Sequence, residues 1–384
     1  MKPEDFANSA AGQCKRTPQG YWAFVPNPLP PKIDYLSSLV SLLSDADRAL
    51  GELAGVGRLL PNPHLLIAPY IRREALLSSR IEGTQATLDD LLLFEAVPSK
   101  GDLEPDLLEV TNYIRTMEYG LKRLETLPIS CRLVGEIHKY LVQEVRGRYS
   151  TSGEFRTSQN WIGPPGCTLN EATFVPPPVQ EMKDAMSDWE KYLHSEPGEP
   201  PLVRCGLMHY QFEAIHPFLD GNGRVGRLLI TFFLCQRGYL PQPLLYLSAY
   251  FERNRAEYYD RLLRVSTAGD WLGWLGFFLR GIVTQAKDAV NWSAQLIDLH
   301  ENYRRRLLGK RVPKGAHGIV DELFVNPYIT ISGASKRWSV SYKTARSAIE
   351  KLAELNILEE VTGQKRNRVY RASELLHVLS EPER

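Results

Sequence analysis

The stretch of the sequence richest in reactive side chains runs from His216 to Arg227 and reads HPFLDGNGRVGR. Gly221 and Gly223 lead into a segment with helical periodicity, and the unpaired N–H groups at a helix start bind phosphate. Arg224 and Arg227 lie three positions apart, so a helix presents both on one face, where they can reach the same polyphosphate. The spacing therefore predicts a polyphosphate site at this helix start.

Two further side chains give this site a chemistry. Asp220 comes directly before the glycines, and a carboxylate beside phosphates typically holds Mg²⁺. His216 stands four positions earlier, at the entrance of the loop, where an imidazole suits a general base. Base, metal ligand, anion site and two arginines together indicate group transfer from a nucleoside triphosphate.

Other interpretations of these residues are weaker. The glycines match the dinucleotide pattern GxGxxG, but a buried strand should precede that pattern and an acidic residue should follow about 20 positions on. Residues 208–215 show no strand alternation, and position 246 is a tyrosine. His216 taken alone would be an ordinary surface histidine beside a glycine turn. The full pattern H-x-F-x-(D/E)-G-N-G-R, however, arises by chance at roughly 10⁻⁹ per start position.

The elements that must position this motif read mostly as helices. Apolar residues recur at helical spacing, and Gly/Pro-rich clusters separate the periodic segments. Residues 147–178 differ, because they are rich in Gly, Pro, Thr and Asn and alternate in two places, which predicts a β-hairpin flap. The prolines between 26 and 31 predict an extended arm. We predict helices at about 34–51, from Pro63 to about 81, from 87, and at 106–124, 130–145, 179–194, 202–215, 223–236, 253–266 and 271–291.

Residues 313–384 show a different order of elements. A short helix at 319–323 precedes two helices at 331–338 and 341–355, and strands at 357–361 and 369–370 follow, which is the order of a helix-turn-helix with a wing. Side chains suited to DNA lie near the start of the second helix, at Tyr342, Lys343, Thr344 and Arg346, and in the wing, at Lys365, Arg366 and Arg368. The segment holds 11 Lys+Arg against 9 Asp+Glu, so docking of a protein stays an open alternative.

Composition limits the class of protein. The 384 residues are 43% hydrophobic with a net charge of +1, so the chain can bury a large core and shows no overall attraction to polyanions. None of the five cysteines forms a CxxC pair, which argues against a disulfide scaffold and a zinc site. We find no signal-peptide pattern and no apolar run of about 20 residues, and we expect a cytoplasmic protein without a membrane span.

The stretch His216–Arg227 resembles the signature of the Fic (Fido) family throughout, including its second arginine. The resemblance extends to Gly153–Arg156 and Asn160–Gly163, which look like the family's flap, and to Tyr258-Tyr259, which resemble the helix beside its adenosine pocket. By that similarity the fold is mainly α, a helical core with a β-hairpin flap and a C-terminal winged helix-turn-helix. The domains would span 1–110 (N-terminal helical region), 111–295 (catalytic core) and 313–384 (winged helix).

The resemblance implies a protein adenylyltransferase, which moves AMP from Mg-ATP to a Ser, Thr or Tyr hydroxyl of a target protein and releases pyrophosphate. By this similarity His216 is the catalytic base, Asp220 holds Mg²⁺ and Arg227 binds the γ-phosphate. The flap would register the target as an added strand. The residues implied in ATP binding are Gly221, Asn222, Gly223, Arg224, Val225, Gly226, Arg227, Asn160, Trp161, Ile162, Gly163, Tyr258 and Tyr259.

A second segment, Ser78–Gly83, fits the family's inhibitory pattern of Ser or Thr, three variable residues, Glu, and Gly or Asn. Ser78 and Glu82 lie one helical turn apart and face the same way. By the resemblance, Glu82 would pair with Arg227 in place of the γ-phosphate and inhibit the enzyme. An equivalent glutamate helps some relatives remove AMP, so reverse activity stays open. The alternative for Glu82 is a solvated residue before a C-capping glycine.

Two other functions stay open. One is a DNA-binding transcriptional regulator whose Fic core only senses nucleotide, although a sensor has no need of the base His216. The other keeps the fold but transfers phosphocholine, phosphate or UMP. The resemblance further suggests a homodimer and allows self-modification, whereas the target protein cannot be read from the chain.

Overall fold

The computed structural model describes residues 1–7, 9–59, 64–97, 104–143, 151–196, 198–313 and 315–380. Within them the protein is mainly helical with two small antiparallel sheets, which confirms the predicted mainly α class. The helices are α1 (Ser37–Leu59), α2 (His64–Ile81), α3 (Leu88–Ala96), α4 (Pro105–Arg123), α5 (Cys131–Leu141), α6 (Val179–His194), α7 (Pro201–Ile215), α8 (Asn222–Gln236), α9 (Ser248–Arg253), α10 (Arg255–Ala268), α11 (Trp271–Leu307), α12 (Ala316–Val325), α13 (Ile331–Arg337), α14 (Tyr342–Glu354) and α15 (Ser373–Ser380). The strands are β1 (Gly12–Arg16), β2 (Trp22–Pro26), β3 (Tyr328–Thr330), β4 (Glu359–Glu360) and β5 (Val369–Arg371), and short 3₁₀ turns lie at Pro3–Phe6 and Leu169–Glu171.

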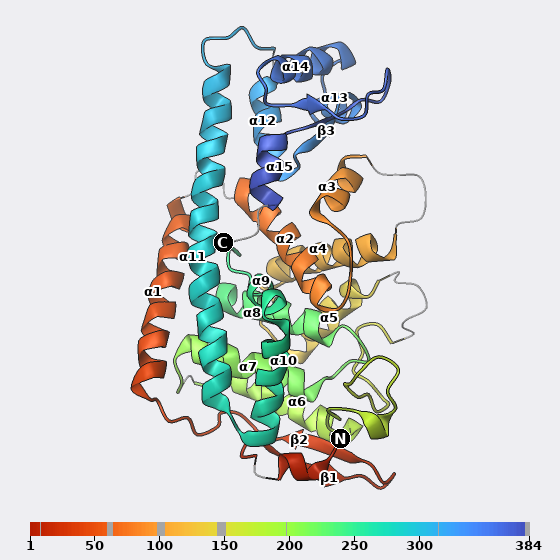
Figure 1. Cartoon of the computed structure of the whole chain (residues 1–384), viewed down its shortest axis with the longest axis vertical. Coiled ribbons are helices and arrows are strands. Elements are labelled where there is room, and N and C mark those ends of the chain that lie inside the picture. Colours follow the sequence, from red (N-terminus) through yellow and green to blue (C-terminus); the bar gives the residue numbers. More distant parts are fainter. Residues whose placement is uncertain are drawn as a thin grey trace.

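Helices α7 and α8 form the centre of the molecule. Nearly every residue of both is buried, because apolar side chains surround each helix rather than forming one stripe. Helices α4, α5, α6 and α10 pack around this pair, and α11 runs from it to the C-terminal elements with α1 along its side (Figure 1). This packing fixes the end of α7 and the start of α8, which meet at the loop from His216 to Gly221.

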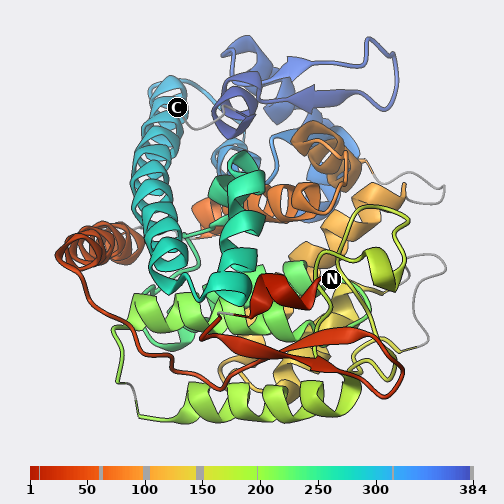
Figure 2. The same cartoon turned by 60° about the horizontal axis from the view of Figure 1, so that its bottom comes forward.

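The N-terminal residues form a hairpin that the sequence interpretation missed. Strands β1 and β2 pair with Cys14 opposite Phe24, and the hairpin lies across α6 and α7 (Figure 2). Its turn closes with the N–H of Gly20 donating to the carbonyl of Thr17 at 2.9 Å, and Gly20 has a φ of 92° that favours glycine. Of the stretch predicted to be extended, only Val25 and Pro26 belong to the paired strand, and residues 27–36 lie outside helices and strands.

The flap is less regular than the predicted β-hairpin. Its residues 147–150 lie outside the described part of the chain, and the rest contains one isolated antiparallel bridge, Ile162 to Phe174. Prolines explain the short pairing, because they lack the N–H that a ladder needs and stand on both sides of the bridge, at Pro164-Pro165 and Pro176–Pro178.

The C-terminal elements follow the predicted order and add two elements, the strand β3 and the final helix α15. α13 and α14 are joined by a tight turn with Ser339 at φ 50°, and β4 pairs with β5. The unpredicted β3 pairs with the other edge of β5, with Ile329 opposite Tyr370. The sheet order is therefore β3-β5-β4.

These C-terminal elements pack directly on α2, α3 and α11. The Tyr328 hydroxyl donates to Asp89 Oδ1 at 2.5 Å, and Asn326 Nδ2 donates to the carbonyl of Leu92 at 3.0 Å. Trp292 Nε1 on α11 donates to the carbonyl of Val378 at 2.9 Å. Helix α2 thus lies between the central helices and the C-terminal elements (Figure 1).

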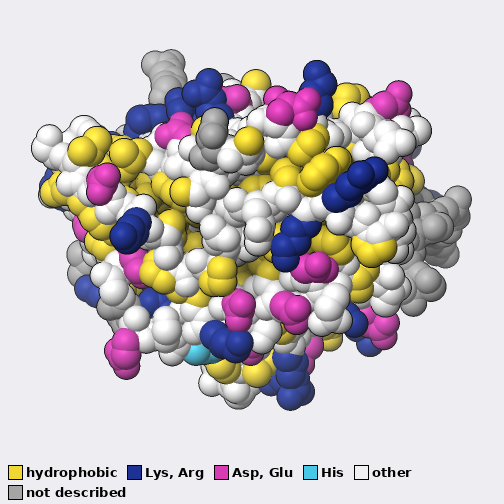
Figure 3. Space-filling view, turned by 90° about the horizontal axis from the view of Figure 1, so that it is seen from below, with side chains coloured by type: hydrophobic (Ala, Val, Ile, Leu, Met, Phe, Trp, Pro, Cys, Tyr) yellow, Lys and Arg dark blue, Asp and Glu magenta, His cyan; other side chains and the backbone are white. Residues whose placement is uncertain are grey.

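The surface agrees with the near-neutral net charge. On the face seen from below, Lys and Arg side chains stand among Asp and Glu side chains and apolar ones (Figure 3). No helix of the described residues is both long enough and apolar enough to cross a bilayer.

Gly120 in α4 should tolerate an added side chain poorly. A Cβ at this position would lie 2.2 Å from Cζ of Phe232 in α8, so the ring would have to move within the core. We expect Gly120→Ala to lower the free energy of unfolding by about 1–3 kcal/mol, measured by urea denaturation.

The matched control is Gly51→Ala in α1, where an added Cβ meets nothing within 4 Å. That variant should gain about 0.5–1 kcal/mol from helix propensity. Equal effects of the two substitutions would contradict the packing argument.

Candidate active site

His216 ends α7 in the left-handed conformation, with φ 50° and ψ 61°. This turn directs the chain out of the core and into the loop. Nδ1 of His216 lies 3.2 Å from the carbonyl of Glu213, which can only accept, so Nδ1 carries the proton and Nε2 the lone pair. Burial lowers the pKa of His216 to about 4. The ring is therefore neutral at physiological pH and can accept a proton.

The loop after His216 is held through its backbone. Arg156 donates from its side-chain Nε to the carbonyl of His216 at 3.0 Å and from its backbone N–H to the carbonyl of Pro217 at 2.9 Å. Asn222 accepts from the N–H of Phe218 at 2.8 Å and donates to its carbonyl at 2.9 Å. Asn160 donates to the same carbonyl at 2.7 Å. Asn160 and Asn222, implied in ATP binding, thus brace this loop.

Helix α8 begins directly after Gly221, whose φ of 78° lies in the left-handed region that glycine adopts readily. The first turn of a helix presents N–H groups without intrahelical partners. Here that turn faces a carboxylate, because a Cβ added at Gly223 would lie 2.5 Å from Glu82 Oε1 and 2.9 Å from Arg227 Nη1. An anionic group therefore already lies against the start of α8.

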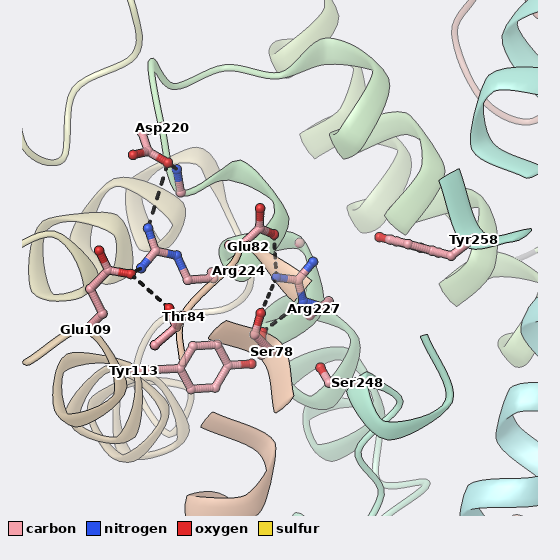
Figure 4. A network of polar contacts seen from close by, with 12 residues as sticks. Ser78, Glu82, Thr84, Glu109, Tyr113, Asp220, Arg224, Arg227, Ser248 and Tyr258 are labelled. Atoms are coloured by element: carbon pink, nitrogen blue, oxygen red, sulfur yellow. Dashed lines mark hydrogen bonds and ion pairs between the residues drawn. The ribbon is translucent and has the colours of Figure 1, made fainter. Parts of the chain in front are cut away.

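Arg227 brings the two sequence motifs together (Figure 4). Its side chain is 2% exposed, and Nη2 donates to Glu82 Oε1 at 2.6 Å. Nε donates to Ser78 Oγ at 2.8 Å, and Nη2 donates to the carbonyl of Ser78 at 2.9 Å. Burial alone would lower the pKa of Arg227, but the Glu82 charge raises it above its usual value. The structure thus joins Ser78, Glu82 and Arg227.

The second arginine has a carboxylate partner that the sequence did not indicate. Arg224 Nη1 donates to Glu109 Oε2 at 2.9 Å, and both side chains are largely buried. Thr84, directly after the Glu82 turn, donates to the same oxygen at 3.4 Å (Figure 4). Glu109 occupies an ordinary helical position in α4, so no local signal could have found it.

Asp220 lies directly before Gly221, and its Oδ1 accepts from the N–H of that residue at 2.5 Å. Its side chain is 35% exposed, and Oδ1 lies 3.7 Å from Arg224 Nη2. The described residues contain no cluster of three His, Cys, Asp or Glu side chains that would enclose a metal. One partly exposed carboxylate beside an anion site nevertheless fits Mg²⁺, which keeps several waters and shares phosphate oxygens.

The other residues implied in ATP binding have different surroundings. Val225 lies in the core, and a Cβ at Gly226 would lie 2.2 Å from Glu213 Oε1, so both positions serve helix packing. Tyr258 is buried, with its hydroxyl 2.9 Å from His209 Nε2, and Tyr259 is exposed. In the flap, a Cβ at Gly163 would lie 2.6 Å from Cys167 Sγ, whereas Trp161 and Ile162 are exposed.

Glu74 is a further buried carboxyl that the sequence interpretation missed. It lies one turn before Ser78 on α2 and accepts from the Tyr113 hydroxyl at 2.9 Å and from Ser248 Oγ at 2.5 Å. The spacing of Glu74, Ser78 and Glu82 at every fourth position is the signal that could have revealed it.

Glu74 should make stability depend on pH. Burial raises its pKa from 4.5 to about 7, so the folded state favours the neutral carboxyl and stability falls as pH rises through this range. Between about pH 5 and about pH 8 we expect wild type to lose ~2 kcal/mol more than Glu74→Gln, measured by urea unfolding. Identical pH dependence in the two proteins would contradict this prediction.

Comparison with known proteins finds two regions of one family in this chain. The Fic/DOC family N-terminal model matches residues 40–122, and the Fic/DOC family model matches residues 128–234. A protein named protein adenylyltransferase Fic from Drosophila grimshawi is 30% identical over 197 residues, which cover 50% of this chain and 37% of that protein. The chain thus matches little more than a third of that relative's length.

Solved structures show the same fold. A Fic family protein from Desulfovibrio desulfuricans G20 is similar with a TM-score of 0.58 and 21% identity, covering 90% of this chain and 98% of that one. Fic-1 from C. elegans, residues 134–508, has a TM-score of 0.51 and 20% identity, covering 68% of this chain and 74% of that one. With its N-terminal region at residues 40–122 and its Fic domain at residues 128–234, the chain belongs to the Fic/DOC family.

Proposed function

We propose that this protein transfers AMP from Mg-ATP to a Ser, Thr or Tyr hydroxyl of a protein, and that Glu82 holds this activity low. The observation that carries the proposal is the arrangement at the start of α8, where a neutral His216 precedes a helix N-terminus with two arginines, one of which already binds a carboxylate. The name of the adenylyltransferase relatives supports the choice of reaction.

In the proposed reaction, His216 Nε2 takes the proton of the target hydroxyl. The freed oxygen forms a bond to the α-phosphorus of ATP, the bond from this phosphorus to the bridging oxygen breaks, and pyrophosphate leaves. Arg227 would hold the γ-phosphate, Arg224 the phosphates beside it, and the amides of 221–223 would complete the anion site. Asp220 would hold Mg²⁺, which neutralises phosphate charge when bound. The exposed flap residues Trp161 and Ile162 would lie beside the target.

The proposed inhibition follows from competition for one guanidinium. A buried arginine can meet one anion at this position, and here that anion is the carboxylate of Glu82. A γ-phosphate could take its place only if the Glu82 turn moved. Removal of AMP by Glu82, self-modification, a homodimer and a cytoplasmic location stay predictions from the sequence.

Glu82→Gly should raise AMP transfer at least about tenfold, because Arg227 then meets the nucleotide instead of a carboxylate. The measurement is intact-protein mass spectrometry after incubation with Mg-ATP, followed by labelled ATP in a lysate if no self-adduct forms. Glu82→Gln should give a smaller rise, since it loses the charge and keeps the side-chain volume.

The control is Glu82→Gly combined with His216→Ala, in which the adduct should vanish. An adduct that is no larger in Glu82→Gly than in wild type would contradict the inhibitory role. Transfer from UTP or CDP-choline in the same assay, with none from ATP, would replace the proposed donor.

The pH profile should report the neutral His216. In Glu82→Gly, kcat/KM should remain constant as the pH is lowered through 6.5. It should fall only with an apparent pKa near 4, because burial disfavours the imidazolium. Circular dichroism at each pH separates this loss from unfolding. An acid limb centred near 6.5 would show that the catalytic base is not in this environment.

A second candidate function is DNA binding by the C-terminal elements. The observation that favours it is the exposed face of α14, where Tyr342 is 52% exposed beside exposed Lys343 and Arg346, with exposed Lys365 and Arg366 in the wing. In the full chain, Lys365→Ala with Arg366→Ala should weaken binding to duplex DNA and flatten its salt dependence, whereas Lys351→Ala at the far end of α14 should not. Salt-independent or undetectable binding by wild type would remove this candidate.

A further inference from the structure

His138 lies in α5, outside every motif of the sequence analysis, yet it touches three parts of the site. Its ring, 3% exposed, stacks on Phe218 with the ring centroids 3.7 Å apart and an interplanar angle of 2°. Nδ1 accepts from the N–H of Gly153, at the base of the flap, at 3.0 Å. Nε2 lies 3.1 Å from the carbonyl of Asp220.

The two backbone partners determine which nitrogen of His138 is protonated. A backbone N–H can only donate, so Nδ1 facing Gly153 carries the lone pair. A carbonyl can only accept, so Nε2 facing Asp220 carries the proton. One neutral tautomer therefore satisfies both contacts at once, and each contact has a fixed direction.

The base of the flap, at Gly153, packs closely against α5, the helix that carries His138. A Cβ at Gly135 would lie 2.7 Å from the carbonyl oxygen of Gly153, and Gly153 itself has a φ of 87° that favours glycine. On the other side of the ring, a Cβ at Gly221 would lie 3.6 Å from His138 Cδ2. His138 thus fills the space between the flap base and the turn into α8.

We propose that His138 is a positioning residue that ties the flap base to the Asp220–Gly221 turn and so holds the metal-binding carboxylate and the first amides of α8 in register for a nucleotide. This inference rests on the proposed function. Arg156, Asn160 and Asn222 brace the first half of the loop, near Phe218, whereas His138 braces its second half.

Three substitutions separate the contacts of His138. Phenylalanine keeps the stacked ring and loses both hydrogen bonds. Glutamine can place its amide N–H near the position of Nε2 and keep the bond to Asp220, whereas asparagine can place its amide oxygen near Nδ1 and keep only the bond to Gly153. All three are made in the Glu82→Gly chain, in which AMP transfer is expected to be measurable.

Two readouts test the proposal. In His138→Phe and His138→Asn, kcat should fall about tenfold or more and the Mg²⁺ concentration for half-maximal rate should rise several-fold, while His138→Gln stays within about threefold of the parent. Hydrogen exchange of the amides in 219–223 should be about tenfold faster in the first two variants and near the parent rate in the third.

Hydrogen exchange can be measured without enzymatic activity, so it tests the positioning role of His138 separately from the proposed function. A parent chain that transfers no AMP would overturn the proposed function, and the exchange rates would still decide the positioning of the Asp220–Gly221 turn. Parent-like exchange and kcat in His138→Phe would overturn the proposal, since the stacked ring alone would then suffice. Equal loss in all three variants, in proportion to lowered unfolding midpoints, would also overturn it by assigning His138 a general packing role.

Discussion

A guanidinium buried in a protein core must have its charge balanced and its N–H groups bonded, and Arg227 imposes this requirement on the surrounding helices. Three of its contacts come from a single helical turn, through the hydroxyl and carbonyl of Ser78 and the carboxylate of Glu82. Helix α2 therefore cannot slide along α8 without leaving a buried charge unpaired. Any ligand that takes the place of Glu82 must itself be an anion.

The loop between α7 and α8 is also held in place by hydrogen bonds. Its backbone groups are bonded by side chains from elsewhere, with Arg156 and Asn160 from the flap, Asn222 from the start of α8 and His138 from α5. The side chains of His216 and Asp220 add contacts of their own, through Nδ1 of His216 with the carbonyl of Glu213 and through Oδ1 of Asp220, which accepts from the N–H of Gly221. Such preorganisation reduces the rearrangement needed when charge develops in a reaction.

What the sequence could predict was local. The residues of His216–Arg227 stand out by their spacing along one segment, the Ser78–Glu82 pair by its match to the family's inhibitory pattern, and the mainly helical fold by periodicity. Glu109 and His138 were missed because their roles arise from packing between distant segments, which leaves no pattern in either one. The β1–β2 hairpin was missed although Pro18 and Gly20 mark its turn, because the prolines after residue 25 dominated the interpretation.

The position of α2 carries one more consequence. Helix α2 also packs on α12. Helix α3 is tied both to α2, through Arg72 and Glu95, and to the C-terminal elements, through Asp89 and Tyr328. The apolar residues of α12, among them Ile319, Leu323 and Phe324, are buried in the shared core. A fragment that ends before α12 would uncover part of this apolar surface and leave α2 supported on fewer sides. The contact between Glu82 and Arg227 should therefore be weaker in such a fragment than in the intact chain. A measurement on the fragment would underestimate how firmly the intact chain holds Arg227.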